Sequence, residues 1–152
     1  MDTIWKPHVV TATVVPRDGR YLFVEEDIEG ERVLNQPAGH LDPGETLLDA
    51  AVRETLEETA WTVRIEALVG VYLIETEVPG KTFLRFCFAA APVSHDAGRT
   101  LDHEIVTTHW LDRTGLVAST VRHRSPMVLR AVDDFEAGNR YPLSLLHDFL
   151  RG

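Results

Sequence analysis

Runs of β-branched and aromatic residues, separated by turn residues, divide the chain into short elements. Such runs are typical of strands, because branched side chains pack well on a pleated surface. They predict strands at residues 8–15, 20–25, 32–35, 63–75, 82–93 and 105–111. The turn residues at positions 16–19 (PRDG) join the first two runs, which predicts a hairpin.

Between residues 46 and 59 the hydrophobic period changes to that of a helix. One apolar stripe at helical spacing is formed by Leu48, Ala51, Val52, Thr55 and Thr59. Thr46, with Asp49 three residues later, resembles a capping box and predicts that the helix starts there. Two further helical patterns cover residues 126–137 and 142–150.

This order of elements lacks the strict alternation of strand and helix that a parallel sheet requires. It predicts a mixed α/β (α+β) fold, with a mixed sheet and helices on both faces. Neither an internal repeat nor a linker interrupts the 152 residues, so we expect one domain over residues 1–152. Cys87 is the single cysteine, which excludes an intrachain disulfide and is compatible with a reducing compartment.

The formal net charge is −9, from 24 acids and 15 bases. Such a chain lacks the basic surface of a protein that binds nucleic acid polymers. No signal-peptide pattern opens the sequence and no apolar run approaches the length of a membrane span. We therefore expect a cytoplasmic protein without membrane partners. The negative charge would also repel a phosphorylated ligand, so an anionic substrate requires a cation between it and the protein.

Acidic residues concentrate in and before the helical segment, at Asp42, Glu45, Asp49, Glu54, Glu57 and Glu58. Three of them, Glu54, Glu57 and Glu58, project into one sector, away from the apolar stripe. Like charges at these spacings destabilise an isolated helix by about 0.2–0.5 kcal/mol per pair. The last two also face the negative end of the helix dipole. A solvated acidic face is the simpler interpretation, and a hard divalent cation such as Mg²⁺ is the alternative that removes the cost.

The spacing of residues over the longer segment 39–61 favours the bound cation over the solvated acidic face. Gly39 is followed after five residues by Glu45, and after seven more by the run 53–61 (RETLEETAW). This pattern resembles the Nudix box, G-x5-E-x7-R-E-U-x-E-E-x-G-U, in which U is a large aliphatic residue. All the polar and glycine positions that carry chemistry match, and a chance match in this length is on the order of one in 10⁵. The chain therefore resembles the Nudix hydrolase family.

Three positions depart from the box, namely Thr55, Ala60 and Trp61. Thr55 still lies on the apolar stripe, so its change concerns packing. Ala60 stands where a helix commonly ends in a left-handed residue, at a cost of about 1 kcal/mol relative to glycine. The departures affect the exit from the helix and leave the acidic side intact.

The resemblance implies the Nudix fold, in which helices enclose a mixed sheet, and a bound Mg²⁺ for which Mn²⁺ can substitute. By their positions in the box, Glu54, Glu57 and Glu58 would bind the metal directly or through water. A backbone carbonyl at Ala38 or Gly39 would assist them.

Hydrolysis also needs a group that accepts a proton from the attacking water. The first candidate is Glu57, and the second is Glu104, because family members often place the base or an extra metal ligand in a loop before the corresponding strand. An ordinary exposed acid is the alternative for Glu104. The resemblance makes Arg53 and Glu45 an ion pair that orients the catalytic carboxylates. Arg53 lies four residues before Glu57, so these two side chains can also touch.

Three residues are candidates for substrate contacts. His40 lies inside the loop of the box, and Lys6 can neutralise phosphate. Arg85 alternates with Leu84 and Phe86 and therefore faces the other side of its strand, where it can enter a cleft. A loop spacer is the simpler alternative for His40 and a surface charge for Lys6, whereas for Arg85 a solvent-facing arginine is an equal alternative.

Short motifs along most of the chain resemble the phosphatase subgroup of NudJ. They are KPHV at 6–9, NQPAGHL at 35–41, FLRF at 83–86, RSP at 124–126 and RYPL at 140–143. The resemblance implies an unselective nucleoside di- and triphosphatase that releases orthophosphate. It also implies action on the pyrimidine diphosphate precursor of thiamine.

Other functions remain open within this resemblance. An ADP-ribose or dinucleoside polyphosphate pyrophosphatase tends to show a proline or tyrosine about sixteen residues past the box, and Pro79 comes slightly late for that. A non-catalytic Nudix-like ligand-binding domain would be expected to have lost one of Glu54, Glu57 or Glu58, and all are present. A Nudix isomerase would need a reactive cysteine, whereas Cys87 sits inside a predicted strand. The expected partner is a small phosphorylated molecule, and the chain can be a monomer or a homodimer.

Overall fold

The computed structural model describes residues 3–76 and 80–151, so Pro79 lies outside the described part. The strands are β1 (His8–Val14), β2 (Pro16–Arg17), β3 (Arg20–Ile28), β4 (Glu31–Asn35), β5 (Ala38–His40), β6 (Trp61–Glu75), β7 (Thr82–His95), β8 (Ile105–Leu111) and β9 (Arg122–His123). The helices are α1 (Leu47–Thr59), α2 (Arg113–Ala118) and α3 (Met127–Glu136), followed by a 3₁₀ turn η1 (Leu143–Leu145).

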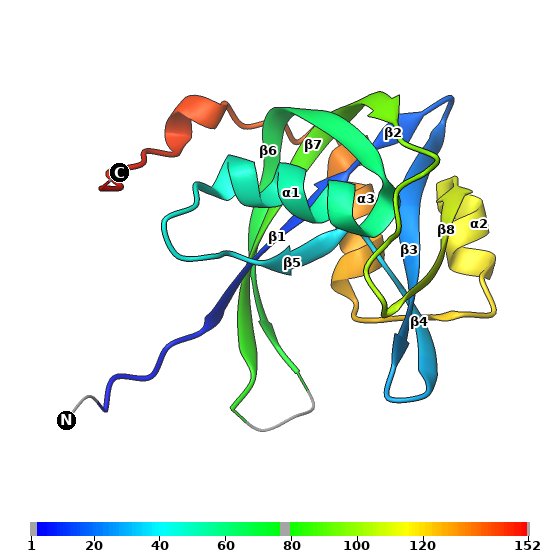
Figure 1. The fold of residues 1–152 in the computed structure, drawn as a ribbon, viewed down its shortest axis with the longest axis horizontal. Helices are drawn as coiled ribbons and strands as arrows, with labels where there is room; N and C mark the ends of the chain where they lie inside the picture. Colours follow the sequence, from blue (N-terminus) through cyan, green and yellow to red (C-terminus); the bar gives the residue numbers. More distant parts are fainter. Residues whose placement is uncertain (1–2, 77–79, 152) are drawn as a thin grey trace.

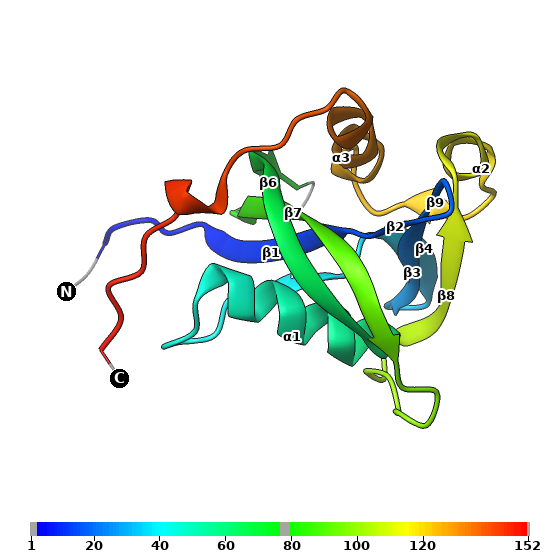
Figure 2. The same cartoon turned by 90° about the horizontal axis from the view of Figure 1, so that it is seen from above.

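The strands form two sheets rather than one. The first has the order β5-β1-β7-β6, with β1 and β7 parallel and the other pairs antiparallel. The second has the order β2-β3-β4-β9, and β8 pairs with β3. Helix α1 lies on one face of the first sheet and α3 on the other (Figures 1 and 2). The predicted mixed α+β architecture, with helices on both faces of a mixed sheet, is confirmed.

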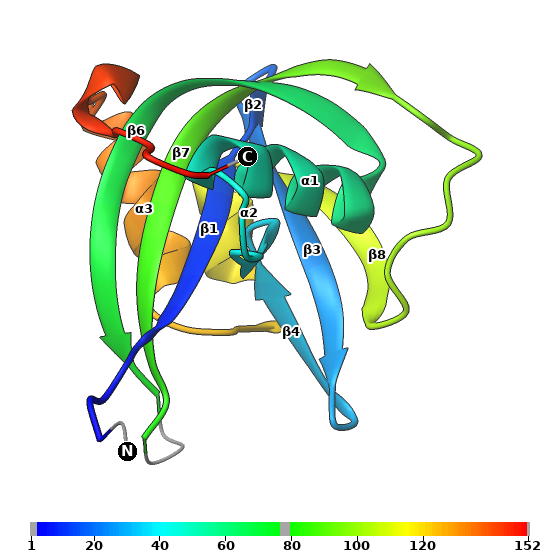
Figure 3. The same cartoon turned by 60° about the vertical axis from the view of Figure 1, so that its left-hand side comes forward.

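Helix α1 has the ends that its sequence predicts. The Thr46 side chain accepts a hydrogen bond from the Asp49 N–H at 3.1 Å, which caps the first turn. At the other end Ala60 adopts φ 64°, the left-handed conformation, and its N–H donates to the Leu56 carbonyl. Between these ends the buried face packs on Leu68 and Phe88 of the first sheet. Figure 3 shows β6 and β7 curving around this helix.

Thr55 and Trp61, the other two residues that depart from the box, each contact a residue on a neighbouring strand. Thr55 is fully buried, and its hydroxyl lies 2.8 Å from the Thr13 hydroxyl on β1. A threonine there pairs with a buried polar group that an aliphatic side chain would leave unsatisfied. Trp61 packs edge-on against Trp110 of β8, with ring centroids 5.8 Å apart. Both substitutions are therefore matched by residues on neighbouring strands.

On the opposite face, α3 covers the larger part of the core. Val128, Ala131 and Val132 are buried against small side chains of β1 and β7, including Ala12 and Ala89. Small residues on the strands allow the helix to approach the sheet closely. The segment before α3 contains β9, which pairs with β4 at the edge of the second sheet.

One sequence prediction about helices is wrong, and one helix was missed. Residues 142–150 form only the 3₁₀ turn η1, because a short helix needs a buried face and Leu145 and Phe149 are exposed. Helix α2 was not predicted, because it is only six residues long and contains Gly115, a poor helix former. The Asp112 side chain caps its first turn by accepting from the Gly115 N–H.

The predicted hairpin is also shorter than expected. Strand β1 ends at Val14 and pairs with β5 and β7, and only Pro16–Arg17 pairs with β3. The chain changes sheets at this point, since β1 belongs to the first sheet and β2 to the second. Within the described residues, no helix has the length and hydrophobicity needed to cross a membrane.

Candidate active site

Arg53 is the centre of an ion-pair network on α1. Its Nε and Nη2 donate to the two carboxylate oxygens of Glu45 at 2.7 and 2.9 Å. Its Nη1 donates to Glu54 at 2.9 Å and to Glu57 at 3.3 Å. A bidentate pair fixes the plane of the guanidinium, so the carboxylates of Glu54 and Glu57 are held in one geometry. The predicted contacts of Arg53 with Glu45 and Glu57 are present.

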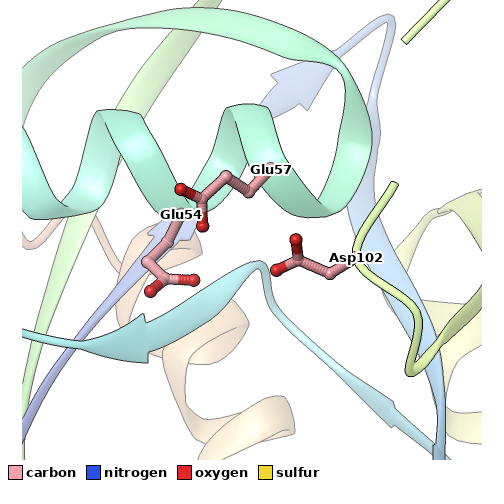
Figure 4. A group of neighbouring side chains, drawn as sticks. All are labelled: Glu54, Glu57 and Asp102. Atoms are coloured by element: carbon pink, nitrogen blue, oxygen red, sulfur yellow. The ribbon is translucent and has the colours of Figure 1, made fainter. Parts of the chain in front are cut away.

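The carboxylates form two groups that share one residue. Glu54, Glu57 and Asp102 make the first group, and Glu58, Asp102 and Glu104 make the second, with ligand atoms in each group within 4.8 Å of one another. Figure 4 shows the first group, in which Asp102 reaches toward the two glutamates of α1 from the loop before β8. The sequence predicted a single cluster of Glu54, Glu57 and Glu58 on the helix. In the structure Glu58 belongs to a different group from the other two, and Asp102 is shared by both groups.

Backbone hydrogen bonds hold the loop that carries Asp102 and Glu104. The Asp102 N–H donates to the Glu57 carbonyl at 3.1 Å, which satisfies a carbonyl at the end of α1. Two residues later, the Glu104 carbonyl accepts the Asp27 N–H of β3 at 2.9 Å. The loop is thus attached to α1 at one acid and to the second sheet at the other.

Strand β5 supplies backbone groups to the same site. The Pro37 carbonyl and the Leu41 N–H hydrogen bond to β1. The N–H and carbonyl groups of Ala38 and His40, which alternate with them, therefore point away from β1. The Ala38 N–H donates to Oε1 of Glu58 at 2.9 Å, and the His40 carbonyl accepts from Nη2 of Arg53 at 3.0 Å. The Ala38 carbonyl, predicted as a metal ligand, belongs to this edge of the strand.

Gly39 lies against α1 for a steric reason. A Cβ atom at this position would collide with the carboxylate of Glu54. Glycine is therefore the residue that allows β5 and the acidic side of α1 to approach. This explains why the box begins with glycine.

Burial makes the carboxylates difficult to ionise. It raises the pKa of Glu58 to about 9, although the hydrogen bond from Ala38 opposes the rise. It raises the pKa of Glu54 to about 7 against the hydrogen bond from Arg53. The pKa of Asp102 is raised as well, by burial first and then by neighbouring carboxylates. The donors are carboxylate and carbonyl oxygens, the ligands that a hard divalent cation prefers, and such a cation would offset this repulsion.

The substrate candidates lie on the other face of the first sheet. His40 and Arg85 both pair with Val10, one on each side of β1. The His40 ring contacts the rings of His8 and Phe83, at centroid distances of 5.5 and 6.1 Å. Burial lowers the pKa of His40, and nearby cations lower it further.

Arg85 is buried on this face, and Lys6 is not. Lys6 is exposed and stands two residues before β1 begins. Arg85 is 5% exposed, and its Nη2 donates to the side-chain oxygens of Gln36 at 2.8 Å and Asn35 at 3.3 Å. The alternative of a solvent-facing arginine is therefore wrong for Arg85. Asp102 and the neighbouring buried Glu26 were not predicted; an acid two residues before Glu104 was the available signal for Asp102.

Comparison with known proteins defines the class. The family model of the NUDIX domain matches residues 6–131, which include both carboxylate groups. The chain belongs to the Nudix family and is a hydrolase that acts on phosphorus-containing acid anhydrides. Members of this family generally use a divalent metal, in agreement with the acidic groups.

Individual relatives narrow the class. The chain is 37% identical over 147 residues to phosphatase NudJ of Escherichia coli K12, covering 96% of this chain and 94% of that protein. Among solved structures, a NUDIX hydrolase from Nitrosomonas europaea superposes with a TM-score of 0.91 and 43% identity, over 95% of this chain and 98% of that one. The MutT protein of Methanosarcina mazei Go1 shares the fold, with a TM-score of 0.72 and 20% identity over 90% and 99% of the two chains. The chain is thus a Nudix hydrolase similar to the NudJ phosphatases.

Proposed function

We propose that residues 1–152 act as one cytoplasmic Nudix hydrolase domain. It cleaves phosphoanhydride bonds of nucleoside di- and triphosphates and of related small diphosphates, among them the thiamine pyrimidine precursor diphosphate. The observation that carries the proposal is the pair of carboxylate groups sharing Asp102 beside the Arg53–Glu45 ion pair. The similarity to phosphatase NudJ supports the broad substrate class.

The cofactor in this proposal is Mg²⁺, with Mn²⁺ able to substitute. Glu54, Glu57 and Glu58, with the Ala38 carbonyl, would hold it. When bound, a divalent cation supplies Lewis-acid charge to the phosphoryl oxygens and lowers the pKa of water. It would also allow a chain of net charge −9 to bind an anionic substrate.

The chain's own residues divide the remaining work. Arg53, held by Glu45, positions the Glu54 and Glu57 carboxylates. Glu57 is the first candidate for the group that takes the proton from water. Glu104 is the second, because its carboxylate lies in the group with Glu58 and Asp102.

The test is a hydrolysis assay on a panel of substrates, in which orthophosphate is measured and the other products are separated by chromatography, because cleavage of ADP-ribose or of a dinucleoside polyphosphate releases nucleotides rather than orthophosphate. The panel contains nucleoside di- and triphosphates, ADP-ribose, a dinucleoside polyphosphate and the thiamine pyrimidine diphosphate, each with Mg²⁺, Mn²⁺ or chelator. The proposal expects orthophosphate from several substrates, only with metal, and loss of release in Glu57→Gln. Glu66→Gln is the matched control, because Glu66 is an exposed acid paired with Arg64 on β6.

Other outcomes identify other functions. Turnover of ADP-ribose or the dinucleoside alone would make the chain a pyrophosphatase of that class and overturn the broad phosphatase proposal. Ligand binding without turnover, by a folded protein that holds metal, would favour a non-catalytic binding domain. Sedimentation of the same samples distinguishes a monomer from a homodimer.

A further inference from the structure

The polar cluster around Arg85 contains a buried donor without an acceptor. Arg85 is 5% exposed, and its Nε has no hydrogen-bond partner among the described residues. Within the described part of the chain, the guanidinium donates from Nη2 to the neutral amide oxygens of Asn35 and Gln36. A buried donor left unpaired costs about 1–3 kcal/mol, and more when it is charged. The fold keeps this cost although a smaller apolar side chain would avoid it.

The cluster is held rigidly from several elements. Gln36 donates from Nε2 to the Val128 carbonyl of α3 at 2.7 Å, so its amide oxygen must face Arg85. Asn35 ends β4, and Arg85 stands in the middle of β7. The orientation of the guanidinium is therefore fixed before any ligand arrives.

A buried acceptor without a donor lies beside it. Glu26 is 4% exposed, and its Oε1 has no partner among the described residues, whereas Oε2 accepts from Arg124 at 3.2 Å. Asn35 links the two residues, because its Oδ1 accepts from Nη2 of Arg85 and its side chain also interacts with the Glu26 carboxylate.

This combination favours a neutral head group over a phosphate. An ionised phosphate supplies only acceptors, so it could pair with Nε of Arg85 but would leave Oε1 of Glu26 without a donor. A planar heterocycle that presents both an acceptor and a donor satisfies Arg85 and Glu26 together. A site built around such groups also rejects analogues that lack them.

The cluster is also close enough to the acidic site for one substrate to reach both. Gln36 and Ala38 are two residues apart, at most about 7 Å along the backbone. The first contacts Arg85 and the second contacts Glu58. The inference therefore requires a substrate whose sugar or methylene linker extends from the diphosphate, past this segment, to the heterocycle.

We propose that Arg85, oriented by Asn35 and Gln36 and accompanied by Glu26, recognises the heterocyclic head group of the substrate through a ring nitrogen or carbonyl acceptor. The inference rests on the proposed hydrolase function, and it adds the residues that select the substrate. It assigns recognition of the non-phosphate part to the α3 face, while the acidic groups act on the anhydride.

The experiment compares two substrates with the same anhydride bond. Cytidine 5′-triphosphate carries a heterocycle with an acceptor and an amine, and inorganic triphosphate carries none. In wild type, kcat/KM with Mg²⁺ is expected to be about tenfold or more higher for the nucleotide. Arg85→Gln and the charge-retaining Arg85→Lys are each expected to reduce that ratio about ten- to hundredfold, with inorganic triphosphate nearly unchanged. Arg64→Gln, an exposed arginine on β6, is the control and should keep the ratio.

Three results would overturn the inference. The first is an equal kcat/KM for the two substrates in wild type, and this result does not depend on whether the Arg85 variants fold. An equal loss on both substrates would give Arg85 a structural or phosphate-binding role. An unchanged ratio in a folded variant would mean that water satisfies Nε.

A binding measurement separates this inference from the proposed function. Calorimetry with cytidine 5′-monophosphate in chelator is expected to show binding by wild type and about tenfold or greater weakening in Arg85→Lys. If wild type binds the monophosphate in this Arg85-dependent way but hydrolyses no anhydride, the hydrolase proposal fails and the head-group site stands. If wild type hydrolyses anhydrides and Arg85→Lys binds as well as wild type, the head-group site fails alone.

Discussion

On the α1 face of the first sheet, carboxylates of one helix and one loop approach one another, whereas on the α3 face one buried guanidinium is surrounded by amide oxygens. Both arrangements are unfavourable for the isolated protein. The first concentrates like charges, and the second buries a donor that finds no acceptor among the residues that the structure describes. Each would be relieved by a different part of one ligand, the first by a cation and its phosphates and the second by a neutral head group.

The two faces also differ in how the chain builds them. Most acidic residues come from the continuous segment 39–58, and the helical period brings them together. The Arg85 cluster takes side chains from β3, β4 and β7 and a carbonyl from α3. Local spacing determines the first site and tertiary packing determines the second. We therefore expect changes on the first face to affect every substrate and changes on the second to affect the choice among substrates.

The largest effect is expected on kcat, when the two candidate bases on the acidic face, Glu57 and Glu104, are replaced in turn. Replacing the group that accepts the proton should lower kcat about 10²–10⁴-fold at saturating Mg²⁺. Comparing Glu57→Gln with Glu104→Gln by steady-state kinetics shows which one it is. The residue that only supports metal binding should lose activity chiefly at low Mg²⁺. If neither variant lowers kcat at saturating Mg²⁺, both candidates are wrong.

A smaller effect is expected from Gly39→Ala. The added Cβ pushes the Glu54 carboxylate out of its place, and such a displacement lowers kcat/KM about 10²-fold. Because the obstacle is the end of a flexible side chain, the thermal midpoint should change little. The control is Gly98→Ala, where the nearest atom to the added Cβ is 3.6 Å away. Full activity of Gly39→Ala would show that the close approach of β5 and α1 is not needed.

The raised pKa of Glu58 predicts how stability depends on pH in chelator. A carboxyl whose folded pKa is about 9, above the ordinary 4.5, binds its proton more tightly in the folded protein. Its favourable contribution is present below about pH 4.5 and is lost as the pH rises through about 9. Thermal unfolding from pH 6 to 9 should therefore show a falling midpoint that Glu58→Gln flattens. Mg²⁺ should raise the midpoint more at pH 8.5 than at pH 6, and a pH-independent midpoint in chelator would contradict this account.

The smallest expected effect concerns the exit of α1. Ala60 has φ 64°, so Ala60→Gly should stabilise the fold by about 1 kcal/mol, or a rise of about 2–4 °C in the midpoint. Activity should stay the same, because Ala60 contributes no side chain to either site. A lower midpoint would mean that the buried Cβ contributes more than the backbone strain costs.

Particular residues show what the sequence could predict. The cap at Thr46, the left-handed Ala60 and the contact of Arg53 with Glu57 follow from spacings within one helix, and all are present. Asp102 stands two residues before a predicted candidate and was still missed, because loop acids have no periodicity that indicates where they point. The unpaired Oε1 of Glu26 and Nε of Arg85 depend on strands that are distant in sequence. Residues 142–150 carry a helical pattern, but their apolar side chains find too little surface to cover.

Main-chain hydrogen bonds at Asp102 and Glu104 attach the loop before β8 to α1 and β3, and the Glu104 side chain pairs with its exposed neighbour His103. The side chains at these two positions can therefore be exchanged without loosening the loop. For protein engineering, the loop therefore offers two positions whose side chains can be varied on a fixed backbone. New ligands or bases could be introduced there while the helix, the sheet and the Arg53 network keep their positions.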